Sequence, residues 1–289
     1  MKLRLKNIGM IKEANVKIDG LTVIAGENDT GKSTLGKVLF KESKNYLLGQ
    51  GSDILIDINE NINPPILIET PEFLSEFKLF NRIIKLEEEL LNDDIEASIE
   101  ELRLPSTKMS LLINLASINQ IESSEIYQNI EEVIKGRVYY DDTNKDILFI
   151  KKGLKEPLLM DSTSSGIKMF GFFQILLLNE SIQNGTILIL DEPEVHLHPK
   201  WQLKMAEIIV ELVKKGVYIV VNSHSPYMIE ALQRYSELSK VNSDFYLAED
   251  GYIKKENDSN SETLAKIFEK LSEPFDVFEE MESERFQNG

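Results

Sequence analysis

Apolar and polar residues alternate at the start of the chain, in "MKLRLKNIGM", where Leu3, Leu5 and Ile8 are separated by charged or polar residues. This period of two predicts a strand with one buried face and does not fit a signal peptide. A second strand is predicted over 14–18. The apolar run "LTVIAG" predicts a third, buried strand, and a helix is expected to begin near Lys32.

Residues 41–136 have a different pattern, in which Leu and Ile recur at helical spacing among acidic residues. "TPEFLSEFKLFNRIIKLEEELL" starts with Thr70 as a helix N-cap and Pro71 at the first helical position. Shorter helices are predicted over 94–103, 108–118 and 125–135. The sequence therefore predicts a helical insertion or lid over 41–136.

Strands and helices alternate again after a predicted hairpin, "RVYYDDTNKDILFI". The helix "IKMFGFFQILLLNE", the apolar strand "TILIL", a helix from Pro199 to about 215, the strand "VYIVV" and a helix after Pro226 follow in turn. Apolar strands between helices favour a largely parallel sheet that is buried on both faces. We therefore predict an α/β fold with a discontinuous core, residues 1–40 and 137–254.

The last part of the chain is acidic. "DFYLAEDGYI" predicts a final hairpin, and Ser261 is expected to cap a C-terminal helix. Residues 255–289 are predicted to form a tail of two amphipathic helical segments around Pro274.

Composition narrows the possible classes. The 289 residues include no cysteine, which excludes a disulfide scaffold and cysteine-ligated zinc. The formal net charge of −17 does not support general nucleic-acid binding, although a local basic patch could bind it. No apolar run approaches the roughly 18 residues of a membrane span. We expect a cytoplasmic protein with no membrane partner.

The stretch "GENDTGKST", Gly26 to Thr34, fits the pattern G-x-x-x-x-G-K-[ST] between a predicted buried strand and a helix. Glycines at 26 and 31 let the backbone approach a phosphate closely. Lys32 is expected to reach the β- and γ-phosphates of a nucleotide, and the Ser33 hydroxyl to bind magnesium. This is a predicted phosphate-binding loop.

A second stretch, "TILILDE", places two acids at the carboxyl end of a buried strand, as a Walker B motif does. Asp191 is expected to hold magnesium, and Glu192 to polarise the attacking water. His196 and His198 follow in "PEVHLHP"; they could bind a metal together with Glu194, or they could shape the loop that leads into the next helix.

Two further segments have the chemistry of anion sites. "IVVNSHSPYMI" ends another buried strand with His224, which would lie beside Asp191 if the two strands are neighbours, where it could bond a γ-phosphate or water. "STSSGIKMF", residues 162–170, puts hydroxyls and a glycine at the start of a helix. A second anion site of this kind could serve the nucleotide of another molecule.

Together these motifs resemble the ABC-type ATPases, specifically the RecF, SMC and OLD-like branch, over roughly 1–40 and 137–250. The resemblance implies a head-to-tail homodimer with two ATP molecules at its interface. The residues expected to hold each ATP are Gly26, Asn28, Gly31, Lys32, Ser33 and Thr34 of one subunit and Ser164, Ser165 and Gly166 of the other. Glu192 and His224 are the expected catalytic residues, and Ser33 and Asp191 the magnesium ligands.

Some family features are missing or uncertain. Gln50, Gln120 and Gln128 are competing candidates for the Q-loop glutamine. The insertion is too short for an SMC coiled coil, and the short tail after the final hairpin leads us to expect no Toprim nuclease domain.

Two functions are compatible with these motifs. In the first, a Mg²⁺-dependent ATPase uses dimerisation to control a separate effector, a nuclease or toxin, in anti-phage defence or a toxin–antitoxin system. The insertion would recognise that partner, or it would serve only as a stabilising lid. In the second, a RecF- or SMC-like repair factor uses ATP as a clamp on DNA, with Lys2, Arg4 and Lys6 on one strand face, or Lys151, Lys152 and Lys155, as the basic contacts.

Overall fold

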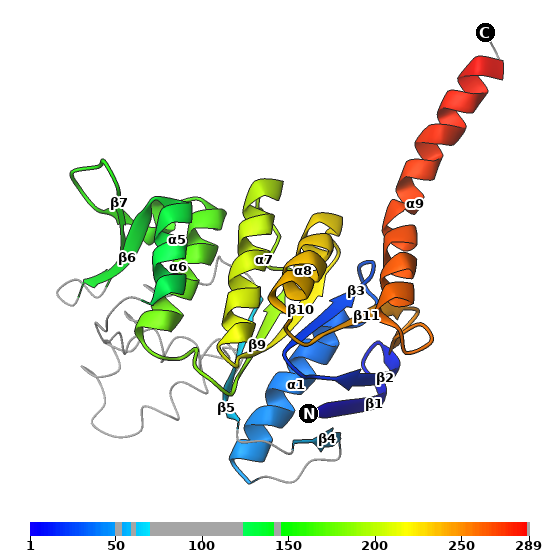
Figure 1. Ribbon diagram of the computed structural model, residues 1–289, viewed down its shortest axis with the longest axis horizontal. Coiled ribbons are helices and arrows are strands. Elements are labelled where there is room, and N and C mark those ends of the chain that lie inside the picture. Colours follow the sequence, from blue (N-terminus) through cyan, green and yellow to red (C-terminus); the bar gives the residue numbers. More distant parts are fainter. Residues whose placement is uncertain (50–53, 59–61, 70–123, 142–145, 288–289) are drawn as a thin grey trace, which may run out of the picture.

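The computed structural model describes residues 1–49, 54–58, 62–69, 124–141 and 146–287, and of residues 55 and 274–287 it describes the backbone alone. Within these residues the chain forms a large curled sheet, helices on both faces of that sheet, and a small second sheet (Figure 1).

The main sheet has nine strands among the described residues, in the order β4-β1-β2-β12-β11-β3-β10-β9-β5. The bounds are β1 Lys2–Ile8, β2 Ile11–Lys17, β3 Leu21–Ala25, β4 Leu55–Asp57, β5 Asn63–Ile68, β9 Thr186–Asp191, β10 Tyr218–Ser223, β11 Ser243–Glu249 and β12 Tyr252–Lys254. The strands β11, β3, β10, β9 and β5 are parallel to one another, whereas β4, β1 and β2 pair antiparallel. The carboxyl ends of the five parallel strands therefore meet at one edge.

Helices cover both faces of this sheet. Their bounds are α1 Lys32–Leu47, α5 Glu125–Ile134, α6 Ser165–Leu178, α7 Pro199–Lys214, α8 Pro226–Ser239 and α9 Asn260–Gln287. On one face, α1 buries Leu35, Leu39 and Phe40 in a cluster with apolar residues of the parallel strands β5, β9 and β10 and of the antiparallel strands β1 and β2. The C-terminal part of α9 projects away from the body (Figure 1).

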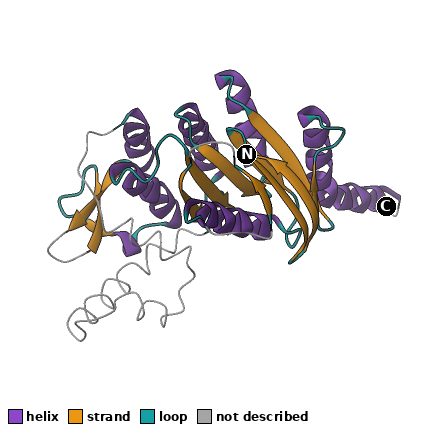
Figure 2. Cartoon of the chain, turned by 90° about the horizontal axis from the view of Figure 1, so that it is seen from below, coloured by secondary structure: helices purple, strands orange, loops and turns teal. Residues whose placement is uncertain are grey.

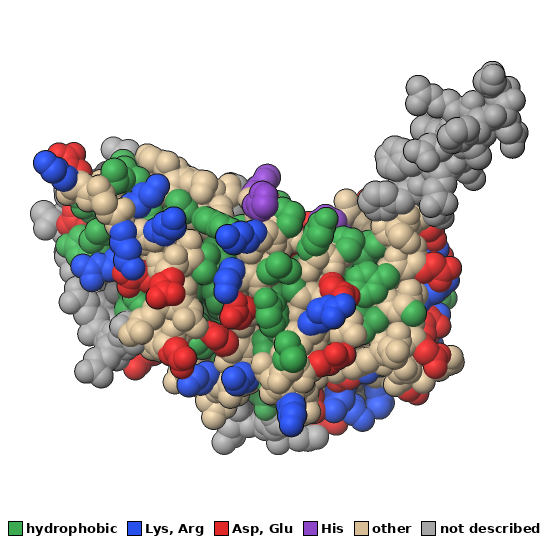
Figure 3. Space-filling model, turned by 45° about the horizontal axis from the view of Figure 1, so that its top comes forward, with side chains coloured by type: hydrophobic (Ala, Val, Ile, Leu, Met, Phe, Trp, Pro, Cys, Tyr) green, Lys and Arg blue, Asp and Glu red, His purple; other side chains and the backbone are tan. Residues whose placement is uncertain are grey.

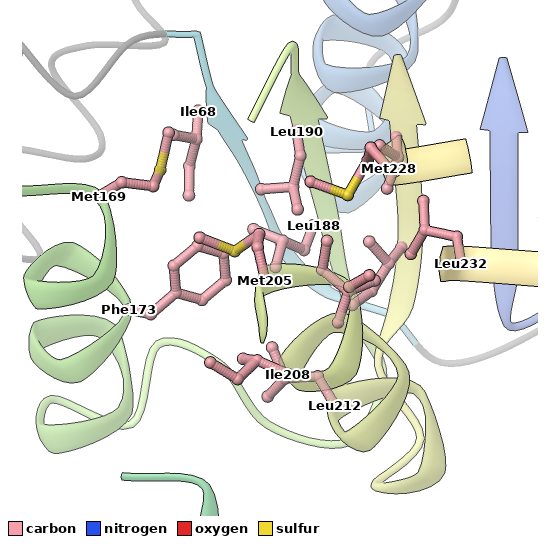
Figure 4. Packing of buried hydrophobic residues seen from close by; sticks show 14 of the residues in the cluster. Ile68, Met169, Phe173, Leu188, Leu190, Met205, Ile208, Leu212, Met228 and Leu232 are labelled. Carbon is pink, nitrogen blue, oxygen red and sulfur yellow. The ribbon is translucent and has the colours of Figure 1, made fainter. Parts of the chain in front are cut away.

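The opposite face carries the larger core. Helices α6, α7 and α8 pack Phe173, Met205 and Met228 toward Leu188 and Leu190 of β9 (Figure 4). Ten of the fourteen residues of α6 are buried. A helix that is apolar on nearly all sides belongs inside the protein, which explains its weak amphipathic pattern.

The small sheet stands beside this helical layer (Figure 2). Its antiparallel strands are β6 Gly136–Asp141, β7 Asp146–Lys151 and β8 Leu158–Leu159, followed by a 3₁₀ turn at Met160–Ser162. The buried amide of Gln174 on α6 accepts a 2.9 Å hydrogen bond from Val138 N, which fastens this sheet to the core. The predicted hairpin over 137–150 is thereby confirmed.

The predicted α/β alternation is confirmed from β1 to α9, with three differences. Strands β4 and β5 lie inside the predicted helical insertion, 41–136, yet both pair with the main sheet because their apolar residues complete its edges. The C-terminal helix starts at Asn260, and Ser259 caps it instead of Ser261. One helix runs through Pro274, where two segments were predicted. The helices predicted from Thr70 and over 94–103 and 108–118 lie outside the described residues, whereas that over 125–135 is confirmed as α5.

Candidate functional site

The predicted phosphate loop joins β3 to α1 at the carboxyl edge of the sheet. Gly31 is the N-cap of α1 with φ +96°, a conformation that favours glycine. A Cβ at Gly26 would lie 2.2 Å from the carbonyl oxygen of Ala248, so glycine is required there by the close approach of β11. The loop thus presents its backbone N–H groups and the positive end of the α1 dipole to one point.

The Lys32 side chain is buried and folds back over this loop. Its ammonium donates hydrogen bonds to the carbonyl oxygens of Gly26 at 2.9 Å and Glu27 at 2.5 Å. Burial lowers the pKa of Lys32, and the carboxylates of Glu192 and Asp191 oppose that shift. A polyanion that replaced the two carbonyl oxygens would favour the charged form of this lysine.

Asp191 and the phosphate loop are connected through Asn222, which is fully buried at the end of β10. The Asn222 Nδ2 donates to Asp191 Oδ1 at 2.8 Å and to the Lys32 carbonyl oxygen at 3.0 Å. One amide therefore fixes the Walker B carboxylate relative to the first turn of α1.

Glu192 has a strained backbone, with φ +52°, which is uncommon for a residue other than glycine. Its N–H donates to the Asn222 carbonyl oxygen at 2.9 Å, and its own carbonyl accepts from Val195 N at 3.0 Å. The Glu192 carboxylate then lies 3.1 Å from His224 Nδ1. Strands β9 and β10 are neighbours as expected, but His224 pairs with Glu192, while Asp191 pairs with Asn222.

A cavity of about 450 Å³ opens between the phosphate loop and the end of β9. Its lining includes most of the predicted residues, namely Asn28, Gly31, Lys32, Ser33, Thr34, Asp191 and Glu192. Its volume falls in the range of small-molecule sites, about 300–1,000 Å³. The loop donors, the helix dipole and the two adjacent carboxylates of Asp191 and Glu192 suit a nucleoside triphosphate with a divalent cation.

The serine-rich segment lies elsewhere. Ser164 is the exposed N-cap of α6, and its side chain makes no capping hydrogen bond. Gly166 is buried, and a Cβ there would lie 2.7 Å from the ring of Trp201. Neither these two residues nor Ser165 belongs to the described residues that line the cavity. The structure therefore brings the phosphate loop, Asp191 and Glu192 together and leaves Ser164, Ser165 and Gly166 outside the cavity lining.

The loop histidines are exposed, and His224 is partly so; histidine side chains lie along one edge of the face shown in Figure 3. His198 accepts a 3.3 Å hydrogen bond from Lys200 N and so caps α7, whereas His196 lies on the cavity wall. Glu194 turns inward to residues 223–225 and is not shared with these histidines. Within the described residues, no three His, Cys, Asp or Glu side chains are grouped to hold a metal.

Several residues of the site carry no motif of their own in the sequence. Glu69, at the end of β5, lines the cavity and forms a 2.9 Å ion pair with Lys37. A role for Asn222 in the site could have been suspected, because it lies two residues before His224 on a predicted strand. Glu69 and Glu194 could not be found in this way, because their partners are distant in sequence. Gln128 is exposed on α5 and does not line the cavity; Gln50 and Gln120 lie outside the described residues.

A family model described as "AAA domain, putative AbiEii toxin, Type IV TA system" matches residues 81–230, just over half of the chain. The Septu protein PtuA of Bacillus thuringiensis is 29% identical over 136 residues, which are 46% of this chain and 31% of PtuA. The Old nuclease of Escherichia phage P2 is 26% identical over 137 residues, 40% of this chain and 23% of that protein. The chain thus spans less than a third of the length of these two relatives.

Among solved structures, the crystal structure of an SMC head bound to the C-terminal winged-helix domain of ScpA superposes with a TM-score of 0.51. The match covers 88% of this chain and 95% of that one at 14% identity, and it shows a shared fold. The resemblance drawn from the motifs is confirmed by these matches. In the described part of the chain, no helix is both long and apolar enough to cross a membrane.

Proposed function

Because the chain belongs to this AAA-domain family and is a P-loop ATPase, we propose that it binds ATP at a head-to-tail dimer interface and uses the cycle of binding and hydrolysis as a switch. The partner would be a separate effector, a nuclease or toxin in defence against phage. The relatives of this chain include a Septu protein and the Old nuclease, and this similarity supports a role in defence against phage.

The observation that carries the dimer is the separation of the two donor groups. The N–H donors of the cavity belong to the phosphate loop and the start of α1, and its carboxylates include Asp191 and Glu192 at the end of β9. Residues 164–166 lie outside its lining. The Ser164 hydroxyl, which makes no capping hydrogen bond, and the first N–H groups of α6 could bind an anion, yet they do not line this cavity. A second copy would bring its α6 to this γ-phosphate.

The residues around the cavity fit magnesium, since an oxygen-only set is what this ion prefers. Ser33 and Asp191 would hold it, and the Asn222 bond keeps the Asp191 carboxylate pointed at the loop. When bound, the ion would neutralise charge on the phosphate oxygens.

The Glu192 carboxylate would act as the general base toward water, with His224 fixing its orientation. The strain at Glu192 is consistent with this role, because such conformations persist where surrounding bonds over-determine them.

Glu192→Gln tests the proposal. This variant should keep ATP binding, form an ATP-dependent dimer and hydrolyse ATP at least ~10²-fold more slowly, the usual scale for losing a general base. Mass in solution with and without Mg-ATP measures the dimer, and phosphate release measures the rate.

Lys32→Ala is the matched control, since it should weaken ATP binding and remove the dimer. A mass that ignores ATP in Glu192→Gln would contradict the shared site. Wild-type turnover by that variant would contradict the role of Glu192.

A second candidate, a DNA clamp, is favoured by one observation. Lys2, Arg4 and Lys6 all project from the outer face of β1, and the exposed Lys17 is the cross-strand neighbour of Lys2. Lys254 is exposed on β12, and a cavity of about 420 Å³ lies among Lys2, Lys17 and Lys254. We call Lys2, Arg4, Lys6, Lys17 and Lys254 the basic face, although Lys17 pairs with Asp19, Lys254 pairs with Glu256, and Asp244 and Asp258 also line this cavity.

A further inference from the structure

Glu194 is a buried carboxylate, with 4% of its surface exposed, in the turn between β9 and α7. Its Oε1 accepts three hydrogen bonds, all from one short segment: Ser223 Oγ at 2.6 Å, His224 N at 3.0 Å and Ser225 N at 3.2 Å. Burial raises the pKa of Glu194. A polar group this deeply buried costs free energy unless its bonds are made, so its place in the turn calls for an explanation.

The position of the three donors, in residues 223–225, explains why Glu194 is buried here. The bonds from His224 N and from its two neighbours leave the backbone of this residue little freedom to turn. The His224 ring then lies between two carboxylates, with Nδ1 3.1 Å from Glu192 Oε1 and 3.9 Å from Glu194 Oε1. Only the nearer of these, Glu192, lines the nucleotide cavity.

The same segment is also bonded to the first turn of α7. Ser225 Oγ donates to Gln202 Oε1 at 2.6 Å, and Gln202 Nε2 donates to the Leu197 carbonyl oxygen at 3.0 Å. Ser225 also caps α8, accepting from Met228 N. Residues 223–225 are therefore fixed between the turn that contains Glu194 and the start of α7.

We propose that Glu194 is a positioning residue of the ATPase site, which holds the backbone of His224 so that its ring meets Glu192. This inference rests on the proposed roles of Glu192 and His224. In this inference Glu194 acts through His224 and does not touch the nucleotide.

Hydrogen-bond acceptance, and not negative charge, is the property that this role needs. Glu194→Gln retains an oxygen at Oε1 for all three donors, whereas Glu194→Ala leaves them without an acceptor. The phosphate loop is untouched in both variants. A positioning role therefore predicts that kcat falls while the affinity for ATP is kept, and that glutamine rescues the loss.

The test measures kcat and KM of ATP hydrolysis, together with the Kd of a nonhydrolysable ATP analogue, in the full-length chain. We expect Glu194→Ala to lower kcat by about tenfold to a hundredfold with Kd unchanged within about twofold, the scale of a misplaced catalytic group. Glu194→Gln should stay within about threefold of wild-type kcat. Glu207→Ala and Glu207→Gln, on the exposed face of α7, are matched controls that should change neither constant.

The outcomes separate the two levels of inference. If the wild-type protein hydrolyses no ATP, the proposed function itself is wrong. If wild type is active and Glu194→Ala matches it, Glu194 has no positioning role. Equal losses of kcat in the Ala and Gln variants would also overturn the inference, as would a weakened Kd and lowered thermal midpoint that account for the loss in Glu194→Ala.

Discussion

At the scale of single residues, backbone conformation shapes the phosphate loop as much as side-chain chemistry does. Gly31 has φ +96°, and a Cβ there would lie 2.9 Å from Ile11 Cγ1. Gly153 has a similar φ of +91° but open space around it. The pair therefore separates the cost of conformation from the cost of steric overlap.

Gly31→Ala should lower the free energy of unfolding by about 2–4 kcal/mol, because strain and overpacking add. Gly153→Ala should cost about 1–2 kcal/mol, from conformation alone. Urea unfolding of both variants without nucleotide measures the difference. Equal losses of stability would show that the overlap with Ile11 relaxes at no cost.

The motif residues were predictable from sequence because phosphate chemistry demands particular residue types at fixed spacing. Lys32, Ser33 and Asp191 were predicted from that spacing, and all three line the cavity. Glu69 and Glu194 were not predictable, since each acquires its place from partners far along the chain. Glu194 was considered only as a metal ligand, and its hydrogen bonds to residues 223–225 lead to a different interpretation.

At the scale of elements, one buried side chain joins the small sheet to α6. Gln174→Ala would leave the Val138 N–H without its acceptor, at a cost of about 1–3 kcal/mol. Amide hydrogen exchange should accelerate in β6 and β7 while β10 keeps its protection. Gln233→Ala, on the surface of α8, removes a bond to Glu237 and should cost no more than about 0.5 kcal/mol. Uniform acceleration across both sheets would contradict a local role.

A helix with a clear period, α7, and a strand with a continuous apolar run, β9, were predicted close to their observed bounds. Strands β4 and β5 were not, because β4 has only three residues and β5 contains Pro64 and Pro65, which argue against a strand. Pro274 was interpreted as a helix break. A proline in a helix removes one hydrogen bond, and α9 continues through it all the same.

At the scale of the whole molecule, charge decides between the two candidate functions. If the basic face binds DNA, affinity should fall steeply with salt, and alanine at Lys2, Arg4 and Lys6 together should lower the slope by about one for each phosphate that is no longer neutralised. Alanine at Lys214, Lys215 and Lys240 removes the same charge from exposed positions that are not candidate DNA contacts, and this triple variant is the control. Equal effects of the two triple variants, or no binding at low salt, would remove the DNA clamp from consideration.

The order of strands also has a consequence for the synthesis of the protein. The central strand β3 leads into the phosphate loop within the first 26 residues, yet its two neighbours are β10 and β11, at 218–249. While the ribosome is still making the middle of the chain, the loop has no sheet to support it. Strand pairings this distant in sequence form slowly, because the entropy cost of closing a long loop comes before the stabilising contacts of the pairing. The phosphate loop is thus synthesised well before the strands that flank β3, so a chain that ends before β10 would not compete for nucleotide.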